Sequence, residues 1–298
     1  MSPDPERRAV GGSHNGPVGF DCLTLTTDYG YEAGFVGVLH AVARKIAPHL
    51  TVINADHSVA AQDVRMGARR LERFVRFAPT AVHVAVVDPG VGGSRRAVAA
   101  IAGNHGFVGP DNGLLCWAAE SVAAPREIQV VVLENERYFL PSRSATFDGR
   151  DIFVPAAAHL ACGADLSGFG PRIDYVDLVR LERPRATVTN DGVALLELLQ
   201  IDHFGNVQTS GDEDTVAALS LQRADRLEVA TIGGGTVIAK YATTFSDAAA
   251  GEAIVLLDSD GCLALSVNCG RGDSLLELAT GAAAGLAAGN REITLRRL

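Results

Sequence analysis

The sequence predicts an α/β domain with a largely parallel central sheet, followed by a smaller, mainly β domain. Two observations support this division. As far as His159, helical segments with an apolar stripe alternate with short apolar strands, which is typical of helices packed on a parallel sheet. Past Pro184, short strands follow one another between glycine turns, which fits a small barrel or sandwich.

The domain boundary is expected in a charged, weakly patterned stretch, 173–184. We therefore expect a first domain over 20–184 and a second over 185–298. Residues 1–19 are polar, contain Pro and Gly, and lack the apolar core of a signal peptide. We interpret them as a disordered N-terminal extension.

The elements of the first domain follow from the spacing of its apolar residues. Apolar and β-branched runs predict strands over 21–27, 51–54, 82–87, 97–102 and 130–134. Apolar residues recur every three or four positions over 34–46 and 61–77, which predicts two helices. An Ala-rich helix is expected near the end of 144–159, after the polar cluster Asp148-Gly149-Arg150-Asp151.

The strands of the second domain are expected to be short and joined by tight turns. They cover 194–201, 226–232, 236–241, 254–257 and 263–267, with a glycine turn at 233–235. The polar segment 202–206 follows the first of these strands, and Asp258-Ser259-Asp260-Gly261 forms a hairpin between the last two. Both polar segments therefore lie at strand ends.

The stretch from Val82 to Leu115 organises the first domain. Its buried strand stops at Asp88-Pro89-Gly90, and a second turn, Gly109-Pro110-Asp111-Asn112-Gly113, follows the strand 97–102. A carboxylate after a buried strand, in a turn that needs glycine, is a common way to present a polar group to a pocket. The same residues also form ordinary surface turns, an alternative that spacing alone favours slightly.

Asp63 and Arg70 lie seven residues apart on the helix expected over 61–77. Seven residues are two helical turns, so both side chains lie along one edge of the helix. Arg70 can then lean toward Asp63, or both can reach a common partner. The alternative is a pair of solvated helix charges, which is the usual outcome for such residues.

The bulk composition excludes several classes of protein. Of 298 residues, 47% are hydrophobic and 20% are charged, which suits a globular protein with a sizeable core. A formal net charge of −9 argues against a nucleic-acid or anionic-membrane partner, since either needs a basic patch. No apolar run is long enough to span a membrane.

Cysteine, histidine and glycine patterns predict no metal site and no dinucleotide site. The five scattered cysteines form no CxxC pair, which indicates a reducing cytoplasm and no zinc site. The histidines show no metal-ligand spacing. The Gly90–Gly93 cluster is not GxGxxG, and a strand follows it where a pyrophosphate site needs a helix N-terminus, so we exclude a dinucleotide site.

Seven motifs occur in an order that resembles one known family. They are TTDYG (26–30), QDVRMGAR (62–69), VHVAVVDPGVG (82–92), FVGPDNGLL (107–115), TFDGRDIF (146–153), IDHFGNVQT (201–209) and LSVNCG (265–270). Spread over nearly the whole chain from Asp21, they resemble the S-adenosyl-L-methionine hydrolases, or SAM hydroxide adenosyltransferases. These enzymes are relatives of the fluorinase and chlorinase halogenases.

The resemblance implies an N-terminal α/β domain and a C-terminal barrel-like β domain. It implies a homotrimer, or a dimer of trimers, with each site between the first domain of one subunit and the second domain of its neighbour. It also implies a reaction, in which water or hydroxide attacks C5′ of the ribose in line and releases adenosine and L-methionine. Methionine leaves the sulfonium as a neutral thioether, so no acid, metal or cofactor is implied, and positioning carries the catalysis.

Carried over residue by residue, the resemblance implies an adenosine site. Asp28 corresponds to the carboxylate that accepts hydrogen bonds from both ribose hydroxyls, a role that suits two acceptor oxygens. Asn206 and Ser259 correspond to residues that hold the adenine edge. Phe204 and Phe245 correspond to aromatic walls beside the adenine.

The resemblance also implies a methionine end and a water site. Asp202 corresponds to the group that binds the methionine ammonium. Asp63 and Arg70 correspond to two members of the catalytic Asp-Arg-His set that holds the attacking water. The third member is the His of a TFHGRD motif, and this chain has Asp148 there. A carboxylate can hold a water and accept its proton, but the exchange can equally mean lost or altered activity.

Two other functions stay open besides the hydrolase. A halogenase of the same fold is one, but Asp88, Val91 and Gly149 occupy the positions that line the halide site of the halogenases, and a carboxylate beside a desolvated halide is strongly repulsive. The halogenase-type insertion between Arg96 and Phe107 is also missing. We therefore expect Asp88 to contact a hydrolase substrate. The other function is a catalytically silent adenosyl-binding protein.

Overall fold

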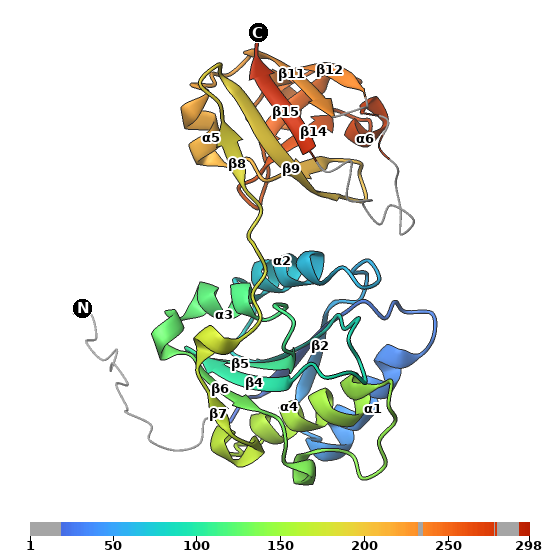
Figure 1. Ribbon diagram of the computed structural model, residues 1–298. Helices are drawn as coiled ribbons and strands as arrows, with labels where there is room; N and C mark the ends of the chain where they lie inside the picture. Colours follow the sequence, from blue (N-terminus) through green and yellow to red (C-terminus); the bar gives the residue numbers. More distant parts are fainter. Residues whose placement is uncertain (1–18, 232–234, 277, 279–291) are drawn as a thin grey trace, which may run out of the picture. The chain divides into compact units, whose positions relative to one another are not determined.

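The computed structural model describes residues 19–231, 235–276, 278 and 292–298, and it divides into two compact units (Figure 1). The first unit holds the chain up to Ser58 together with 74–179, and the second holds 59–73 together with 180–298. The expected extension over 1–19 lies almost entirely outside the described residues, as do two residues of the expected turn at 233–235.

The second unit includes a segment that the sequence alone assigns to the first domain. Residues 59–73 contain most of α2, Val64–Val75, and three of their charged side chains form ion pairs within this unit. Arg65 pairs with Glu197 at 2.6 Å, Glu72 with Arg183 at 2.9 Å, and Arg73 with Asp260 at 2.7 Å. These ion pairs join the helix to segments that are far away in sequence, which hydrophobic periodicity does not reveal.

A seven-stranded mixed sheet forms the middle of the first unit, in the order β2-β1-β3-β5-β4-β6-β7. The strands are β1 Cys22–Thr27, β2 Thr51–Asp56, β3 Val82–Val86, β4 Ala97–Ala102, β5 His105–Pro110, β6 Gln129–Val132 and β7 Arg172–Ile173. The pairs in β2-β1-β3-β5 are parallel, and β4, β6 and β7 add antiparallel pairs. The predicted α/β domain is confirmed, with its parallel strands in one half of the sheet.

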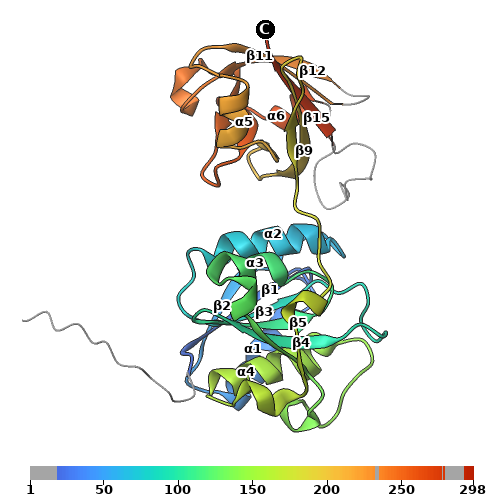
Figure 2. The same ribbon diagram turned by 60° about the vertical axis from the view of Figure 1, so that its left-hand side comes forward.

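Helices cover both faces of this sheet (Figures 1 and 2). On one face α1, Phe35–Ile46, lies beside α4, Val154–Ala161, and α3, Cys116–Val122, covers β4 and β5 on the other face. The helix α1 buries Val36, Leu39 and Ala43, whose three- and four-residue spacing puts them on one stripe. Apolar burial on that stripe therefore fixes the helix against the sheet.

The parallel strands place three polar turns at one edge of the sheet. β1, β3 and β5 are neighbours, and each is followed at its carboxyl end by an Asp-bearing turn. The side-chain amide of Asn112, after β5, donates to the Val87 carbonyl, after β3, at 2.8 Å. The two Asp-bearing turns of the stretch 82–115 are therefore held side by side.

A closed barrel of seven strands forms the second unit. Its strand order is β10-β14-β13-β12-β11-β15-β9, and a β10–β9 pairing closes it, with β8 added at the edge of β9. The strands are β8 Ala186–Val188, β9 Val193–Ile201, β10 Val207–Thr209, β11 Arg226–Thr231, β12 Thr236–Tyr241, β13 Ala253–Leu257, β14 Leu263–Val267 and β15 Glu292–Arg297. Two short helices, α5 Glu213–Ala218 and α6 Gly272–Leu275, accompany them. The barrel, and not the sandwich, is thus the architecture of this unit.

No helix among the described residues is both long enough and apolar enough to cross a membrane.

A buried histidine in the first unit links stability to pH. His83 on β3 has no exposed surface, and its Nδ1 lies 2.8 Å from the Thr24 hydroxyl while its Nε2 lies 2.9 Å from Nδ1 of His105. Burial, and then the neighbouring His105, lowers the pKa of His83 to about 3. The native state therefore holds this imidazole neutral at pH values where an unfolded chain protonates it.

We predict that the protein loses stability as the pH falls from about 6.5 toward the lowered pKa of His83, because only the unfolded chain takes up that proton. His83 alone contributes a slope of up to about 1.4 kcal/mol per pH unit. Urea unfolding at several pH values measures it for the wild type and for His83→Gln. His49→Gln, at an exposed position, is the control. An unchanged slope in His83→Gln contradicts the prediction.

Candidate functional site

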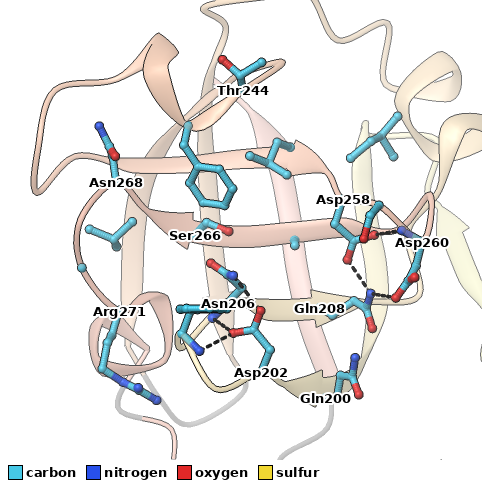
Figure 3. Close-up of a pocket in the computed structure, with 18 of the residues that line it drawn as sticks. Gln200, Asp202, Asn206, Gln208, Thr244, Asp258, Asp260, Ser266, Asn268 and Arg271 are labelled. Atoms are coloured by element: carbon cyan, nitrogen blue, oxygen red, sulfur yellow. Dashed lines mark hydrogen bonds between the residues drawn. The ribbon is translucent and has the colours of Figure 1, made fainter. Parts of the chain in front are cut away.

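A pocket of about 1020 Å³ opens in the barrel unit (Figure 3). The loop after β9, the segment 243–245, the hairpin between β13 and β14, and the residues after β14 line it. The five barrel residues that the sequence predicted as substrate ligands all lie in this lining: Asp202, Phe204, Asn206, Phe245 and Ser259. The structure thus brings together residues that are up to 57 positions apart in the printed sequence, from 202 to 259.

Asp202 fixes the loop that carries Asn206 (Figure 3). One carboxylate oxygen accepts hydrogen bonds from the backbone N–H groups of Phe204 and Asn206, both at 2.9 Å. The other oxygen accepts one from the Asn206 side-chain amide at 2.7 Å. This hydrogen bond orients the amide, and its oxygen receives no hydrogen bond from the described residues. An amide held in this way suits the edge of a base that offers both a donor and an acceptor.

Gln208 on β10 fixes the hairpin that carries Ser259. Its side-chain oxygen accepts a hydrogen bond from Arg69 at 2.6 Å, which orients its amide nitrogen toward the hairpin. That nitrogen donates to Asp258 and, at 3.0 Å, to Asp260. The side-chain amide of Gln208 thus accepts through its oxygen and holds one wall of the pocket through its nitrogen, whose hydrogen bonds are drawn in Figure 3.

Two aromatic side chains of the pocket are exposed. Phe204 is 71% exposed and Phe245 is 43% exposed, although large apolar side chains are usually buried. Exposed aromatic rings beside a polar pocket mark a surface that gains free energy when a flat apolar ligand or another protein surface covers it.

A largely buried charge cluster, formed by Arg95, Asp88 and Asp148, lies in the first unit. Arg95 donates from Nε to both oxygens of Asp88, at 3.1 and 2.9 Å, and from Nη2 to Asp88 at 2.6 Å. The same Nη2 donates to Asp148. The side chains of Arg95 and Asp148 are each 14% exposed, and that of Asp88 is 5% exposed. Two carboxylates thus share one guanidinium, which leaves the cluster with a formal charge of −1.

Glycines bring the members of this charge cluster together. Asp88 follows β3, and the turn after it contains Gly92, which has a φ of +75°. A Cβ atom at Gly92 would lie 2.5 Å from the Ala145 carbonyl oxygen, so the turn packs directly on the segment that leads to Asp148. Only glycine permits both that φ and that approach.

Tyr29 lies beside the charge cluster. Its ring packs edge-on against Phe147 with the centroids 5.7 Å apart, and its hydroxyl would lie 2.4 Å from a Cβ atom at Gly149. Burial, and then three nearby carboxylates, raise the pKa of the Tyr29 hydroxyl, with Arg95 opposing them. The hydroxyl therefore keeps its proton and remains a hydrogen-bond donor.

Arg95 stays charged despite its burial. Burial alone would lower its pKa, but the hydrogen bonds and charges of Asp88 and Asp148 outweigh that effect, and the pKa lies above the ordinary value. The guanidinium also lies over the Phe153 ring, with 5.2 Å between its central carbon and the ring centroid. A cation–π contact of this kind stabilises the charge from a second side.

The remaining predicted residues lie in different units. Asp28 follows β1 in the first unit, in the turn where the Tyr29 N–H donates to the Thr27 hydroxyl at 3.1 Å. Asp63 and Arg70 belong to the segment 59–73 of the second unit, where Asp63 accepts a hydrogen bond from the backbone N–H of Met66 at 2.9 Å. The water site expected from Asp63, Arg70 and Asp148 therefore stays a prediction.

Family models match both units. A model of the SAM hydroxide adenosyltransferase N-terminal domain matches residues 23–170, and a model of the C-terminal domain matches 196–284. The chain is also 44% identical over 261 residues to (R)-S-adenosyl-L-methionine hydrolase from Salinispora arenicola (strain CNS-205), covering 87% of this chain and 95% of the relative. This chain belongs to the SAM hydroxide adenosyltransferase family.

A solved structure and a more distant relative also match the chain. The crystal structure of a conserved protein from Thermotoga maritima matches with a TM-score of 0.79 and 33% identity, covering 93% of this chain and 100% of that one. A fluorinase from Actinoplanes sp. (strain N902-109) is 25% identical over 272 residues, covering 83% of this chain and 90% of the relative. The hydrolase is therefore the more similar relative, as the motifs predicted.

Sequence reasoning missed Arg95, Tyr29 and Gln208. Arg95 belongs to the same glycine turn as Asp88, seven residues after it, which is a signal of proximity. Its second partner, Asp148, lies 53 positions away, and no local pattern connects the two. Gln208 and Tyr29 lie inside the quoted motifs IDHFGNVQT and TTDYG, so the motifs located them without giving them a role.

We predict that Gly149→Ala lowers the free energy of unfolding by about 1–3 kcal/mol, because the new methyl group would meet the Tyr29 hydroxyl at 2.4 Å. In a Tyr29→Phe background the cost should shrink, because the next atom of that ring is 3.3 Å away. Urea unfolding of the double-mutant cycle measures this. Gly37→Ala, where no atom lies within 4 Å, is the control. Equal costs in both backgrounds would show that Tyr29 does not limit the space at Gly149.

Proposed function

We propose that this protein is an enzyme that hydrolyses S-adenosyl-L-methionine to adenosine and L-methionine. The observation that carries the proposal is the 44% identity to a hydrolase of that name, over 95% of its length. The barrel pocket supports it, since all five barrel residues expected to contact the substrate line one cavity. The substrate is a small molecule, and neither nucleic acid nor membrane takes part.

The adenosine end of the substrate would occupy the barrel pocket. The oriented amide of Asn206 would pair with the adenine edge, with Ser259 beside it and the exposed rings of Phe204 and Phe245 against the base. Asp28, with two acceptor oxygens, would receive both ribose hydroxyls. Asp202 would bind the methionine ammonium, using lone pairs that remain beyond its three hydrogen bonds to the loop.

The chemistry needs alignment more than acid catalysis. The sulfonium releases methionine as a neutral thioether, so the leaving group takes up no proton. A water must instead be held in line with the C5′–S bond, and such alignment can lower the barrier by about 7–11 kcal/mol. We propose that Asp63, Arg70 and Asp148 hold this water, and that the reaction uses no metal and no cofactor.

The charge cluster argues against a halogenase, because it disfavours the binding of a halide ion. Asp88 and Asp148 with Arg95 leave a formal charge of −1 in a largely buried site, where a halide ion would be repelled. A silent adenosyl-binding protein remains the second candidate, because Asp148 replaces the family histidine.

The proposed enzyme would work in the cytoplasm as a homotrimer. All five cysteines are free, which suits a reducing compartment: Cys22, Cys116, Cys162, Cys262 and Cys269. The exposed phenylalanines of the pocket offer apolar surface to a neighbouring subunit. Each site would then combine Asp28, Asp88 and Asp148 of one subunit with the barrel pocket of the next.

We predict equal amounts of adenosine and methionine when the protein is incubated with S-adenosyl-L-methionine, with no halogenated product in chloride or fluoride. Chromatography of the products measures this, and EDTA should leave the rate unchanged. Asp28→Ala is the comparison, and it should weaken adenosine binding by about 2–4 kcal/mol. Adenosine binding in calorimetry without turnover would favour the silent protein. Activity lost to EDTA and restored by a divalent metal would refute the metal-free reaction.

We predict that two inactive variants, Asp28→Ala and Asn206→Ala, regain activity when their subunits are mixed during assembly. If one site takes Asp28 and Asn206 from different subunits, some mixed trimers contain sites with both residues intact. Turnover of the co-assembled variants, with sedimentation to establish the oligomeric state, measures this. Each variant assembled alone is the control. An active monomer, or mixing without recovery, would place each site within one chain.

A further inference from the structure

We propose that Arg95 is a positioning residue for the attacking water, which it serves by holding Asp148 through a network shared with Asp88. The inference rests on the proposed function, and it assigns a role to a side chain that the family resemblance left without one. Three charged side chains that are 14%, 5% and 14% exposed are costly to bury unless they are paired. Their pairing with one another is therefore a built feature of this site.

The fork of the guanidinium sets the geometry of the cluster. Nε and Nη2 of Arg95 both donate to Asp88, which fixes the plane of the guanidinium. Nη2 then donates to Oδ2 of Asp148. Among the hydrogen bonds of the described residues, none reaches Oδ1 of Asp148. One oxygen of Asp148 is thus held, and the other is left to accept a hydrogen bond from a water.

Asp148 obtains no such support from the arginine nearest in sequence. Arg150 donates from Nε and Nη2 to Asp151, at 2.6 and 2.9 Å, and Asp151 has no exposed surface. Arg150 therefore holds the buried Asp151. Arg95, which reaches Asp148 across 53 positions, is the guanidinium that the structure pairs with it.

The charge of Arg95 matters as much as its shape. A guanidinium stays protonated, so it offsets the repulsion between the two carboxylates and allows them to lie on either side of it. Only an ionised Asp148 can accept a proton. In the proposed step the water oxygen bonds to C5′, and the C5′–S bond breaks with its electron pair going to sulfur. The water proton passes to Asp148 and from there to solvent.

The test compares Arg95→Gln and Arg95→Lys with Arg96→Gln. Arg96 is the matched control, because it precedes the same strand β4 and pairs with another buried carboxylate, Asp111, at 2.6 Å. Arg95→Gln should lower kcat at least about tenfold and leave the Kd for adenosine within about twofold, because the water is engaged chiefly in the transition state. Arg95→Lys should recover part of kcat, since it restores the charge without the fork.

Coupling to Asp148 separates positioning from stability. In an Asp148→His background the Arg95→Gln loss should become small, because the carboxylate it holds is gone.

The possible outcomes distinguish a failure of this inference from a failure of the proposed function. If Arg95→Gln loses kcat only in proportion to its melting temperature, without coupling to Asp148 and without partial recovery in Arg95→Lys, Arg95 is structural and the inference is wrong. If Arg95→Gln keeps the wild-type kcat, the inference is also wrong, and the proposed function stands. If the wild type releases no adenosine and methionine, the proposed function itself fails, and this inference fails with it.

Discussion

The parallel pairing of β1, β3 and β5 is the constraint on which the charge cluster depends. Parallel neighbours end at the same edge of a sheet, so the turns after them meet there without any further instruction in the sequence. Asp28 and Asp88 follow two of these strands, and Asn112 ties the turn after the third to Val87 at 2.8 Å. The π-helical turn at Gly149–Phe153 then adds Asp148 from a distant part of the chain.

Closure of the barrel brings together residues of the pocket, as the parallel pairing does for the charge cluster. The pairing of β9 with β10 brings the two ends of the segment 202–206 together, so this short loop must turn sharply. Gly205, with a φ of +85°, allows the turn, and Asp202 satisfies its backbone N–H groups. Asp202, which we propose to bind the substrate ammonium, thus also shapes the loop, and the two roles would draw on different lone pairs.

The sequence predicted best the elements whose apolar spacing is regular. β1, α1 and β3 begin and end within one or two residues of their expected bounds, because burial of one face dictates the pattern. β5 was missed because its glycines imitate a turn. A Cβ atom at Gly109 would lie 2.3 Å from the Ala85 carbonyl oxygen, so this glycine permits close packing of strands and does not end one.

The residues of the candidate site were also predictable only in part. The motif IDHFGNVQT located Asp202, Phe204 and Asn206, because it is continuous in sequence. Phe245 and Ser259 lie outside the seven motifs, and only the residue-by-residue resemblance indicated them. The partners of Arg95 were not predictable in this way, because an ion pair between a turn near β3 and the segment before α4 arises only when the sheet is assembled. For the same reason, the pairing of Arg65, in the segment 59–73, with Glu197 of β9 leaves no local pattern.

The charge cluster has a formal charge of −1, and it would therefore favour water over a halide ion as the nucleophile. A halide brings a negative charge that is lost as it bonds to C5′, so carboxylates beside it raise the free energy of the ground state and hinder its binding. A water brings no charge, and it becomes positive as it bonds to C5′ unless its proton leaves. Carboxylates beside it therefore interact more strongly with the transition state than with the bound substrate, which is the condition for catalysis. By this argument a carboxylate at position 148 would suit the attack by water that we propose, provided that a fixed cation such as Arg95 holds it in place.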